Sequence, residues 1–162
     1  MQNMRTSQEI ERYYNSIAKG YNELYGEEQL DKAKALLKYI EPKGYLLDIG
    51  AGTGITTQLF SDNATCVLLD PSENLLNQAR GAAVLGRAEY LPFPDNTFDT
   101  IISLTALHHA NLAQALTEIY RVAKKDAVIG VTLPKHAKID FTLLKAFKKY
   151  KQEKDWIFIL SL

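Results

Sequence analysis

Two patterns of apolar residues alternate along the chain. Short, continuous apolar runs are typical of strands buried on both faces of a sheet, whereas apolar residues three or four positions apart are typical of helices with one buried face. The runs predict strands at Tyr45–Ile49, Thr65–Leu69, Ala83–Gly86, Phe98–Leu104, Ala127–Leu133 and Trp156–Leu160. The remaining segments predict helices at Ser7–Lys19, Glu27–Ile40, Ile55–Phe60, Ser72–Arg80 and Leu112–Lys124, and a lysine-rich helix at Ile139–Glu153.

Strands that alternate with helices form right-handed βαβ units. The sequence therefore predicts an α/β fold: a doubly wound, Rossmann-like, mostly parallel sheet of about six strands with helices on both faces. In such sheets, ligands bind beyond the carboxyl ends of the strands. Residues 50–54, 70, 87–90 and 105–109 each follow a predicted strand, so we expect them to lie in one cluster.

A glycine-rich loop, Gly50-Ala51-Gly52-Thr53-Gly54, follows the first predicted strand. Glycines adopt positive φ and let a ligand approach the backbone closely. Their spacing is one residue tighter than the dinucleotide-binding G-x-G-x-x-G pattern, which favours a nucleoside with an amino-acid tail. Asp70 follows the second strand and can accept both hydroxyls of a ribose held over the loop. Simple packing of the loop, and capping of the next helix by Asp70, are the structural alternatives.

Composition narrows the class of protein without indicating a substrate. The chain has 162 residues, and its 19 basic and 19 acidic residues leave no net charge to attract nucleic acid or an anionic membrane. The single cysteine, Cys66, cannot form an internal disulfide, and the first residues contain no apolar signal segment. We expect a cytoplasmic protein without membrane contact. It is predicted to be one domain over residues 1–162, with a lid over 1–26, a core over 44–134 and a short C-terminal part over 135–162.

Several stretches together resemble one family in their order and spacing. They are Tyr13–Tyr25, Leu46–Gly54, Leu69–Ser72, Gly86–Asp99, Ser103–His109 and Glu118–Val122. Taken together, over about residues 13–133, the chain resembles class I S-adenosylmethionine-dependent methyltransferases of the type 11 group, which is similar to the ubiquinone and menaquinone biosynthesis enzymes. The resemblance implies S-adenosylmethionine as cofactor and methyl transfer as the activity.

The resemblance also implies a set of cofactor-binding residues. Asp70 would bind the ribose hydroxyls, and Asp48 would bind the glycine loop or, through water, the cofactor ammonium. The other implied residues border the adenine, the ribose or the amino-acid tail, or close over it. The full set is Tyr13, Tyr21, Asp48, Gly50, Ala51, Gly52, Gly54, Asp70, Pro71, Ala88, Glu89, Leu104 and Thr105.

His108 and His109 are the implied catalytic residues. Methyl transfer from a sulfonium chiefly requires positioning and exclusion of water, and one histidine would take a proton from an oxygen nucleophile. The alternative is that both histidines pack against, or cap, the following helix. No metal is expected.

After the fifth strand, the chain departs from the family pattern. The family has a helix and then an antiparallel two-stranded hairpin, whereas one apolar run, Trp156–Leu160, remains here. The long predicted helix makes a parallel crossover the default for this strand, but the short turn at 154–155 and the family pattern favour the antiparallel direction. The shortened end predicts a small pocket under the N-terminal helix, or one completed by a second subunit in a homo-oligomer.

Three functions stay open at this stage. A methyltransferase acting on a small-molecule acceptor is favoured. A tRNA-modifying methyltransferase is the second, because Lys145, Lys148, Lys149, Lys151 and Lys154 would be able to contact phosphate, although such lysines more often form a solvated helix face. A non-catalytic module that binds S-adenosylmethionine is the third, because the C-terminal part is short.

Overall fold

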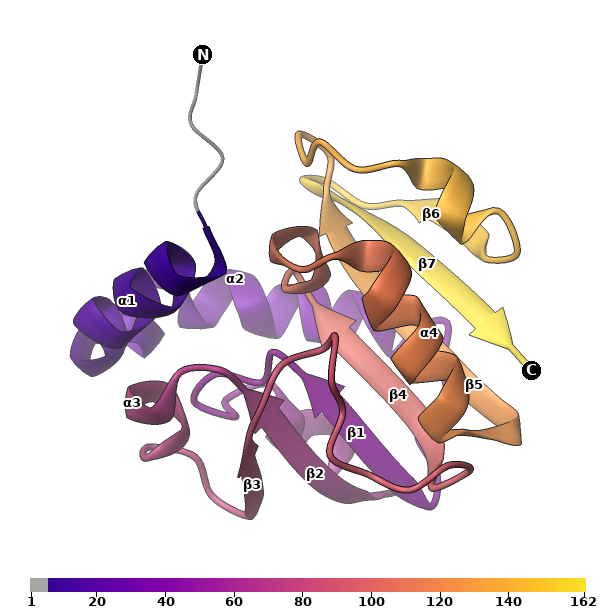
Figure 1. Ribbon diagram of the computed structural model, residues 1–162, viewed down its shortest axis with the longest axis horizontal. Helices are drawn as coiled ribbons and strands as arrows, with labels where there is room; N and C mark the ends of the chain where they lie inside the picture. Colours follow the sequence, from indigo (N-terminus) through magenta and orange to yellow (C-terminus); the bar gives the residue numbers. More distant parts are fainter. Residues whose placement is uncertain (1–5) are drawn as a thin grey trace.

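A computed structural model describes residues 6–162, which fold around a seven-stranded sheet of order β3-β2-β1-β4-β5-β7-β6 (Figure 1). The strands are β1 (Tyr45–Ile49), β2 (Thr65–Asp70), β3 (Ala82–Leu85), β4 (Phe98–Leu104), β5 (Ala123–Pro134), β6 (Lys148–Lys151) and β7 (Asp155–Ser161). Strands β1 to β5 run parallel, β7 pairs antiparallel with β5, and β6 pairs antiparallel with β7. The predicted α/β, mostly parallel sheet is confirmed.

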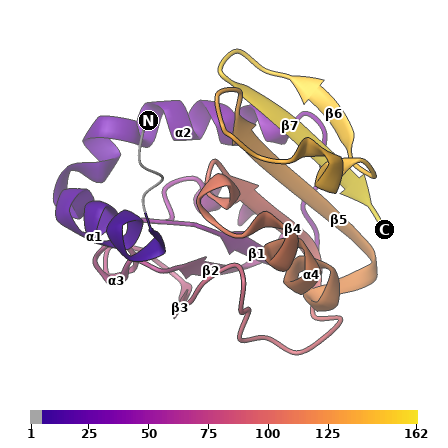
Figure 2. The same ribbon diagram turned by 45° about the horizontal axis from the view of Figure 1, so that its top comes forward.

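Helices cover both faces of this sheet, as predicted. The α-helices are α1 (Ser7–Ile17), α2 (Tyr21–Leu36), α3 (Glu73–Leu76) and α4 (Leu112–Val122); the 3-10 helices are η1 (Ala18–Gly20), η2 (Thr57–Phe60), η3 (Leu107–His109) and η4 (Phe141–Leu144). Helix α4 lies in front of the sheet and α2 behind it, and each contributes to a separate buried cluster (Figures 1 and 2). None of the helices in residues 6–162 combines the length and apolar character that crossing a bilayer requires.

The central strands are apolar on both sides because both layers of helices cover them. Leu46 and Leu47 of β1 are fully buried, and Leu47 lies between Val67 of β2 and Ile101 of β4. Beyond β1, the backbone N–H groups of residues 50 and 51 both donate to the carbonyl of Leu69, at 2.7 and 3.1 Å. These two bonds hold the glycine loop over the end of β2.

The N-terminal helix begins with a capping box. The Thr6 hydroxyl accepts from the N–H of Glu9, whose carboxylate accepts from the N–H of Thr6. Asn15 then ties α1 to α3, because its side-chain oxygen accepts from the Ser72 hydroxyl at 2.7 Å and from the N–H of Asn74 at 3.2 Å. Both contacts hold α1 beside the carboxyl end of β2.

Three of the predicted helices have different bounds. The helix predicted at 27–40 begins at Tyr21 and ends at Leu36, so it continues almost directly from α1 through η1. The helix predicted at 55–60 is the short 3-10 helix η2, in which the Thr57 hydroxyl bonds Asp48. The helix predicted at 72–80 ends at Leu76, and the Ser72 hydroxyl caps it by accepting from the N–H of Leu75.

The helix predicted at Ile139–Glu153 is wrong. This segment forms η4, which the Asp140 side chain caps by accepting from the N–H of Thr142 at 2.9 Å, and then strand β6. In β6, Tyr150 stacks on Tyr39, with 4.1 Å between the ring centroids. Backbone pairing with β7 overrides the helix propensity of the lysines.

The C-terminal hairpin corrects a second expectation. The sequence shows one apolar run after β5, but β6 supplies a second, polar strand, so the sheet has seven strands where six were predicted. Strand β7 is antiparallel to β5, as favoured. Because β6 covers the outer edge of β7, this edge needs no second subunit to pair it.

Candidate active site

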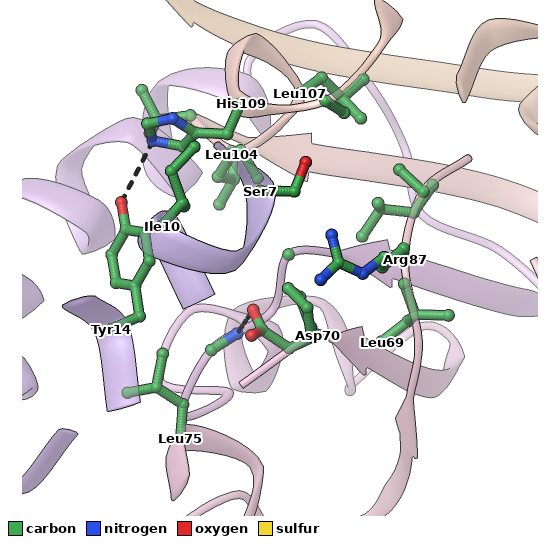
Figure 3. A pocket seen from close by; sticks show the side chains of 18 of the residues that line it. Ser7, Ile10, Tyr14, Leu69, Asp70, Leu75, Arg87, Leu104, Leu107 and His109 are labelled. Carbon is green, nitrogen blue, oxygen red and sulfur yellow. Dashed lines mark hydrogen bonds between the residues drawn. The ribbon is translucent and has the colours of Figure 1, made fainter. Parts of the chain in front are cut away.

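Loops that follow four parallel strands line one cavity, and Ser7, Ile10 and Tyr14 of α1 complete its lining (Figure 3). Ten of the residues implied from the sequence line it: Tyr21, Gly50, Gly52, Asp70, Pro71, Ala88, Glu89, Leu104, Thr105 and His109. The cluster predicted from the strand ends is therefore confirmed. Most of the remaining wall is apolar, with Leu69, Leu75 and Leu107 among its side chains.

The glycines of the loop serve different purposes. Gly50 has φ +77°, and a Cβ atom there would collide with that of Ala106, so both the backbone conformation and the close approach of Ala106 require a glycine. Gly52 has φ +56°, but a Cβ atom there would come no closer than 3.7 Å to Leu75. Gly52 therefore leaves free space on the cavity wall.

Asp70 ends β2 at the edge of this space. Its Oδ2 accepts from the N–H of Gly52 at 2.9 Å and its Oδ1 from the N–H of Ser72 at 2.8 Å (Figure 3). Burial raises the pKa of this carboxyl group, and the two N–H donors oppose that rise. A carboxylate has about four lone-pair positions, so Asp70 keeps acceptor capacity for a ligand.

Three implied residues lie behind the cavity wall. Asp48 is buried beneath the loop, where its Oδ2 accepts from the Thr57 hydroxyl at 2.6 Å rather than from the loop backbone. Burial raises its pKa to about 7, the Thr57 bond opposes this, and Asp70 adds to it. Ala51 packs in a small cluster with Leu68, and Gly54 also faces that side chain.

Of the tyrosines near the cavity, Tyr14 and Tyr21 line it, while Tyr13 instead bonds the Tyr25 hydroxyl at 3.0 Å. Burial raises the pKa of Tyr21. Tyr14 lies one helical turn beyond Ile10, and both side chains face the cavity. Their four-residue spacing was the feature of the sequence that could have placed Tyr14 on this face of the helix. Tyr14 was missing from the predicted cofactor-binding set, and a role for Tyr13 stays a prediction.

Arg87 was expected in the cluster at the strand ends, although not among the cofactor-binding residues, and it lies at the cavity wall (Figure 3). Its guanidinium binds Glu11 of α1 at 2.7 Å, so it joins the lid helix to the loop after β3. The neighbouring Glu89 uses its carboxylate to accept from the N–H of Asn111 at 2.9 Å.

A second cavity adjoins the first. The two share Tyr14, Tyr21, Gln29, Thr105 and His109. The rest of the second lining is largely polar or charged: Tyr25, Glu28, Lys32, His108, Pro134, His136, Lys154 and Asp155. In residues 6–162, no group of three or more His, Cys, Asp or Glu side chains is arranged to hold a metal ion.

The paired histidines lie at the boundary between the cavities. His109 Nε2 is 3.3 Å from the Tyr14 hydroxyl (Figure 3), and its ring centroid is 3.8 Å from that of His108. His108 Nδ1 is buried without a hydrogen-bond partner among the described residues. Burial lowers the pKa of His108 to about 3, with His109, His136 and Lys32 contributing, so this imidazole is neutral at pH 7.

Comparison with known proteins agrees with this architecture. The family model for the methyltransferase domain matches residues 47–131, more than half of the chain. The chain belongs to the methyltransferase-domain family. An uncharacterized protein of Methanocaldococcus jannaschii is 33% identical over 128 residues, 76% of this chain and 51% of that protein. A ubiquinone/menaquinone biosynthesis C-methyltransferase of Hydrogenovibrio crunogenus is 31% identical over 137 residues, 71% of this chain and 54% of the enzyme.

The similarity extends to solved structures. A Methanococcus maripaludis protein assigned as an S-adenosyl-L-methionine-dependent methyltransferase superposes with a TM-score of 0.77 at 15% identity, covering 93% of this chain and 92% of that one. This similarity shows the fold. The chain spans about half the length, or less, of these curated relatives. Family and fold together imply S-adenosylmethionine as the cofactor.

The first cavity suits this cofactor. The space beside Gly52 would accept a ligand close to the backbone, the spare acceptor positions of Asp70 suit a pair of ribose hydroxyls, and the apolar wall suits a purine ring.

Proposed function

We propose that this chain transfers a methyl group from S-adenosylmethionine to a small-molecule acceptor bound in the second cavity. The observation that carries the proposal is the junction of two unlike cavities. One is apolar and bordered by Gly52 and Asp70, and the other is polar and bordered by both histidines. A donor in the first cavity and an acceptor in the second would meet at the shared wall.

The residues of the first cavity would hold the cofactor. Asp70 would bind its ribose, Ala88 and Leu107 would flank its base, and Thr105 would meet its amino-acid tail. The bound cofactor supplies a methyl group on a positively charged sulfur. Ile10 and Tyr14 of α1 would cover the cavity and exclude water, because positioning and dehydration are the main requirements of this displacement.

The two histidines would have different roles. A group with a pKa of about 3 is a poor base at neutral pH, so His108 would offer a hydrogen bond through its free Nδ1. We assign removal of the acceptor proton to the other ring nitrogen of His109, Nδ1, because Tyr14 hydrogen-bonds Nε2 and thereby orients the ring. This assignment favours an acceptor that carries an O–H or N–H group.

RNA is the less favoured acceptor. A groove beside the second cavity carries Glu23, Glu27, Asp31 and Glu153, and both of its lysines already contact carboxylates. These charges would repel a phosphate backbone. The lysines expected on one helix face lie instead around β6, where Lys149 covers the ring of Trp156 at 3.8 Å.

One experiment separates the functions. Purified protein is incubated with S-adenosylmethionine and either a fractionated small-metabolite extract or bulk tRNA, and formation of S-adenosylhomocysteine is measured. We expect turnover with a metabolite fraction. Turnover with tRNA alone would contradict the acceptor class, and cofactor binding without turnover on either substrate would identify a binding module.

A matched pair of variants connects turnover to the first cavity. Gly52→Val places a side chain in the free space and should abolish cofactor binding, although its positive φ also adds strain. Gly20→Ala is the control, because a Cβ atom there meets nothing within 4 Å. If the Gly52 variant is folded and binds the cofactor normally, the placement of the cofactor is wrong.

A further inference from the structure

Lys32 is a buried cation that no sequence motif indicates. It lies in α2 with 8% of its surface exposed, and a buried ammonium group is strongly unfavourable unless it is paired. Its Nζ lies 2.7 Å from Glu28 Oε1, 3.1 Å from Asp155 Oδ2 and 3.3 Å from Thr105 Oγ1. Each of its N–H donors therefore has an oxygen within reach.

The three contacts differ in kind. Glu28 is one turn away on the same helix and also pairs with Lys154 at 3.1 Å, so it would keep a cationic partner without Lys32. The Asp155 contact is an attraction between charges, because Oδ2 of this residue accepts no directed hydrogen bond from the described residues. The Thr105 contact is a hydrogen bond to a residue that lines both cavities.

Thr105 has an unusual backbone that needs support. Its φ is +53°, a left-handed conformation that β-branched residues rarely adopt. Its N–H donates to the carbonyl and to the hydroxyl of Thr132, both at 3.0 Å. Its hydroxyl accepts from Lys32 and donates to Gln29 Oε1 at 3.3 Å. This turn directs the chain from β4 into η3, which carries both histidines.

We propose that Lys32 is a positioning residue for the cofactor cavity. Its hydrogen bond to the Thr105 hydroxyl fixes the left-handed turn that forms the wall between the cavities. Lys32 thereby sets cofactor affinity through Thr105, without contacting the cofactor itself. The proposal rests on the proposed function, since it assumes that the cofactor occupies the first cavity.

The test separates this role from simple stabilisation. Lys32→Met combined with Asp155→Asn removes both buried charges, so the double variant should unfold near the wild-type temperature. Its affinity for S-adenosylhomocysteine, measured by calorimetry, should be about tenfold weaker, as expected for one lost hydrogen bond. Asp155→Asn alone is the control, because it keeps the bond between Lys32 and Thr105 and should bind as the wild type does.

Thr105→Val completes the test by removing the hydroxyl and keeping the side-chain shape. It should weaken binding at least as much, because the hydroxyl also bonds Gln29, and adding the double variant to it should cause no further loss. Wild-type affinity in Thr105→Val overturns the proposal even if the double variant does not fold. An equal loss in Asp155→Asn alone also overturns it, because the ion pair would then be responsible. Failure of the wild-type protein to bind would instead contradict the proposed function.

Discussion

The two cavities are neighbours but are built in different ways. The first is shaped by backbone and apolar side chains: Gly50 and Gly52 set its floor, and its one buried carboxylate, Asp70, is held by two backbone N–H groups. The second is shaped by ion pairs and imidazoles, with Lys32 between Glu28 and Asp155. A backbone-built site tolerates much sequence change, whereas a site built from side chains changes with each substitution. We therefore expect the first cavity to supply the shared chemistry and the second to supply acceptor specificity.

The largest expected effect is in the ionic cavity. Lys32→Met leaves the buried Asp155 carboxylate unpaired and should lower the free energy of unfolding by about 4 kcal/mol. Urea denaturation at pH 7 measures this change. Lys34→Met is the control, since the exposed pair of Lys34 with Asp31, at 3.6 Å, contributes less than about 1 kcal/mol. Equal effects in the two variants would show that the second cavity does not depend on a buried ion pair.

A pH-dependent effect should come from beneath the first cavity. The Asp48 pKa is about 7 in the folded protein, above its value of about 3.9 in an unfolded chain. The folded state therefore holds a proton that the unfolded state releases, and this stabilisation is complete below pH 4 and is lost as pH rises through 7. At pH 8, the free energy of unfolding of Asp48→Asn should exceed that of the wild type by on the order of 3 kcal/mol. At pH 4, the two values should be similar. Urea curves with the same difference at both pH values would contradict this.

Asp70→Ala tests the carboxylate that faces the first cavity. It should weaken binding of S-adenosylhomocysteine by about 1–3 kcal/mol, the cost of lost hydrogen bonds at a buried site. Titration calorimetry gives the affinity, and circular dichroism verifies the fold. Asp62→Ala, at an exposed position, serves as the control. Unchanged affinity in the Asp70 variant would place the ribose elsewhere.

The smallest effect should come from the link between lid and loop. Glu11→Gln weakens the ion pair between Glu11 and Arg87. Both side chains are 35% exposed, so the variant should reduce the free energy of cofactor binding by only about 0.5 kcal/mol at low salt. Salt screens such pairs, so the difference between variant and wild type should vanish near 1 M salt. A difference that persists at high salt would indicate a role other than charge.

The first cavity was largely predictable because its parts are local. Each loop directly follows an apolar strand, so the glycine spacing and the position of Asp70 could be read along the chain. Tyr14 was missed as a lining residue because the phase of a short lid helix depends on what it packs against. The position of Asp48 next to the loop was predicted, but its hydrogen bond to Thr57 was not. That bond forms because residues 57–60 are a short 3-10 helix and not part of the longer helix that the sequence predicts.

The second cavity was not predictable because its contacts are distant in sequence. Lys32 and Asp155 meet only because α2 covers the sheet beside β7. Asp155 begins β7 only because the segment before it pairs as β6, and the lysines of that segment favoured a helix. Periodicity alone does not report such pairing, which is decided by the neighbouring strand.

Strand β6 has a consequence for how copies of the protein behave together. An exposed strand edge offers free N–H and C=O groups, and edge-to-edge association of sheets is a common route to aggregation. Here the edge strand has four residues, three of them lysines: Lys148, Lys149 and Lys151. A second sheet approaching in the same way would bring its own lysines against these, and the repulsion would oppose joining the two edges. The polar strand therefore opposes pairing of two copies of the protein through their β6 edges.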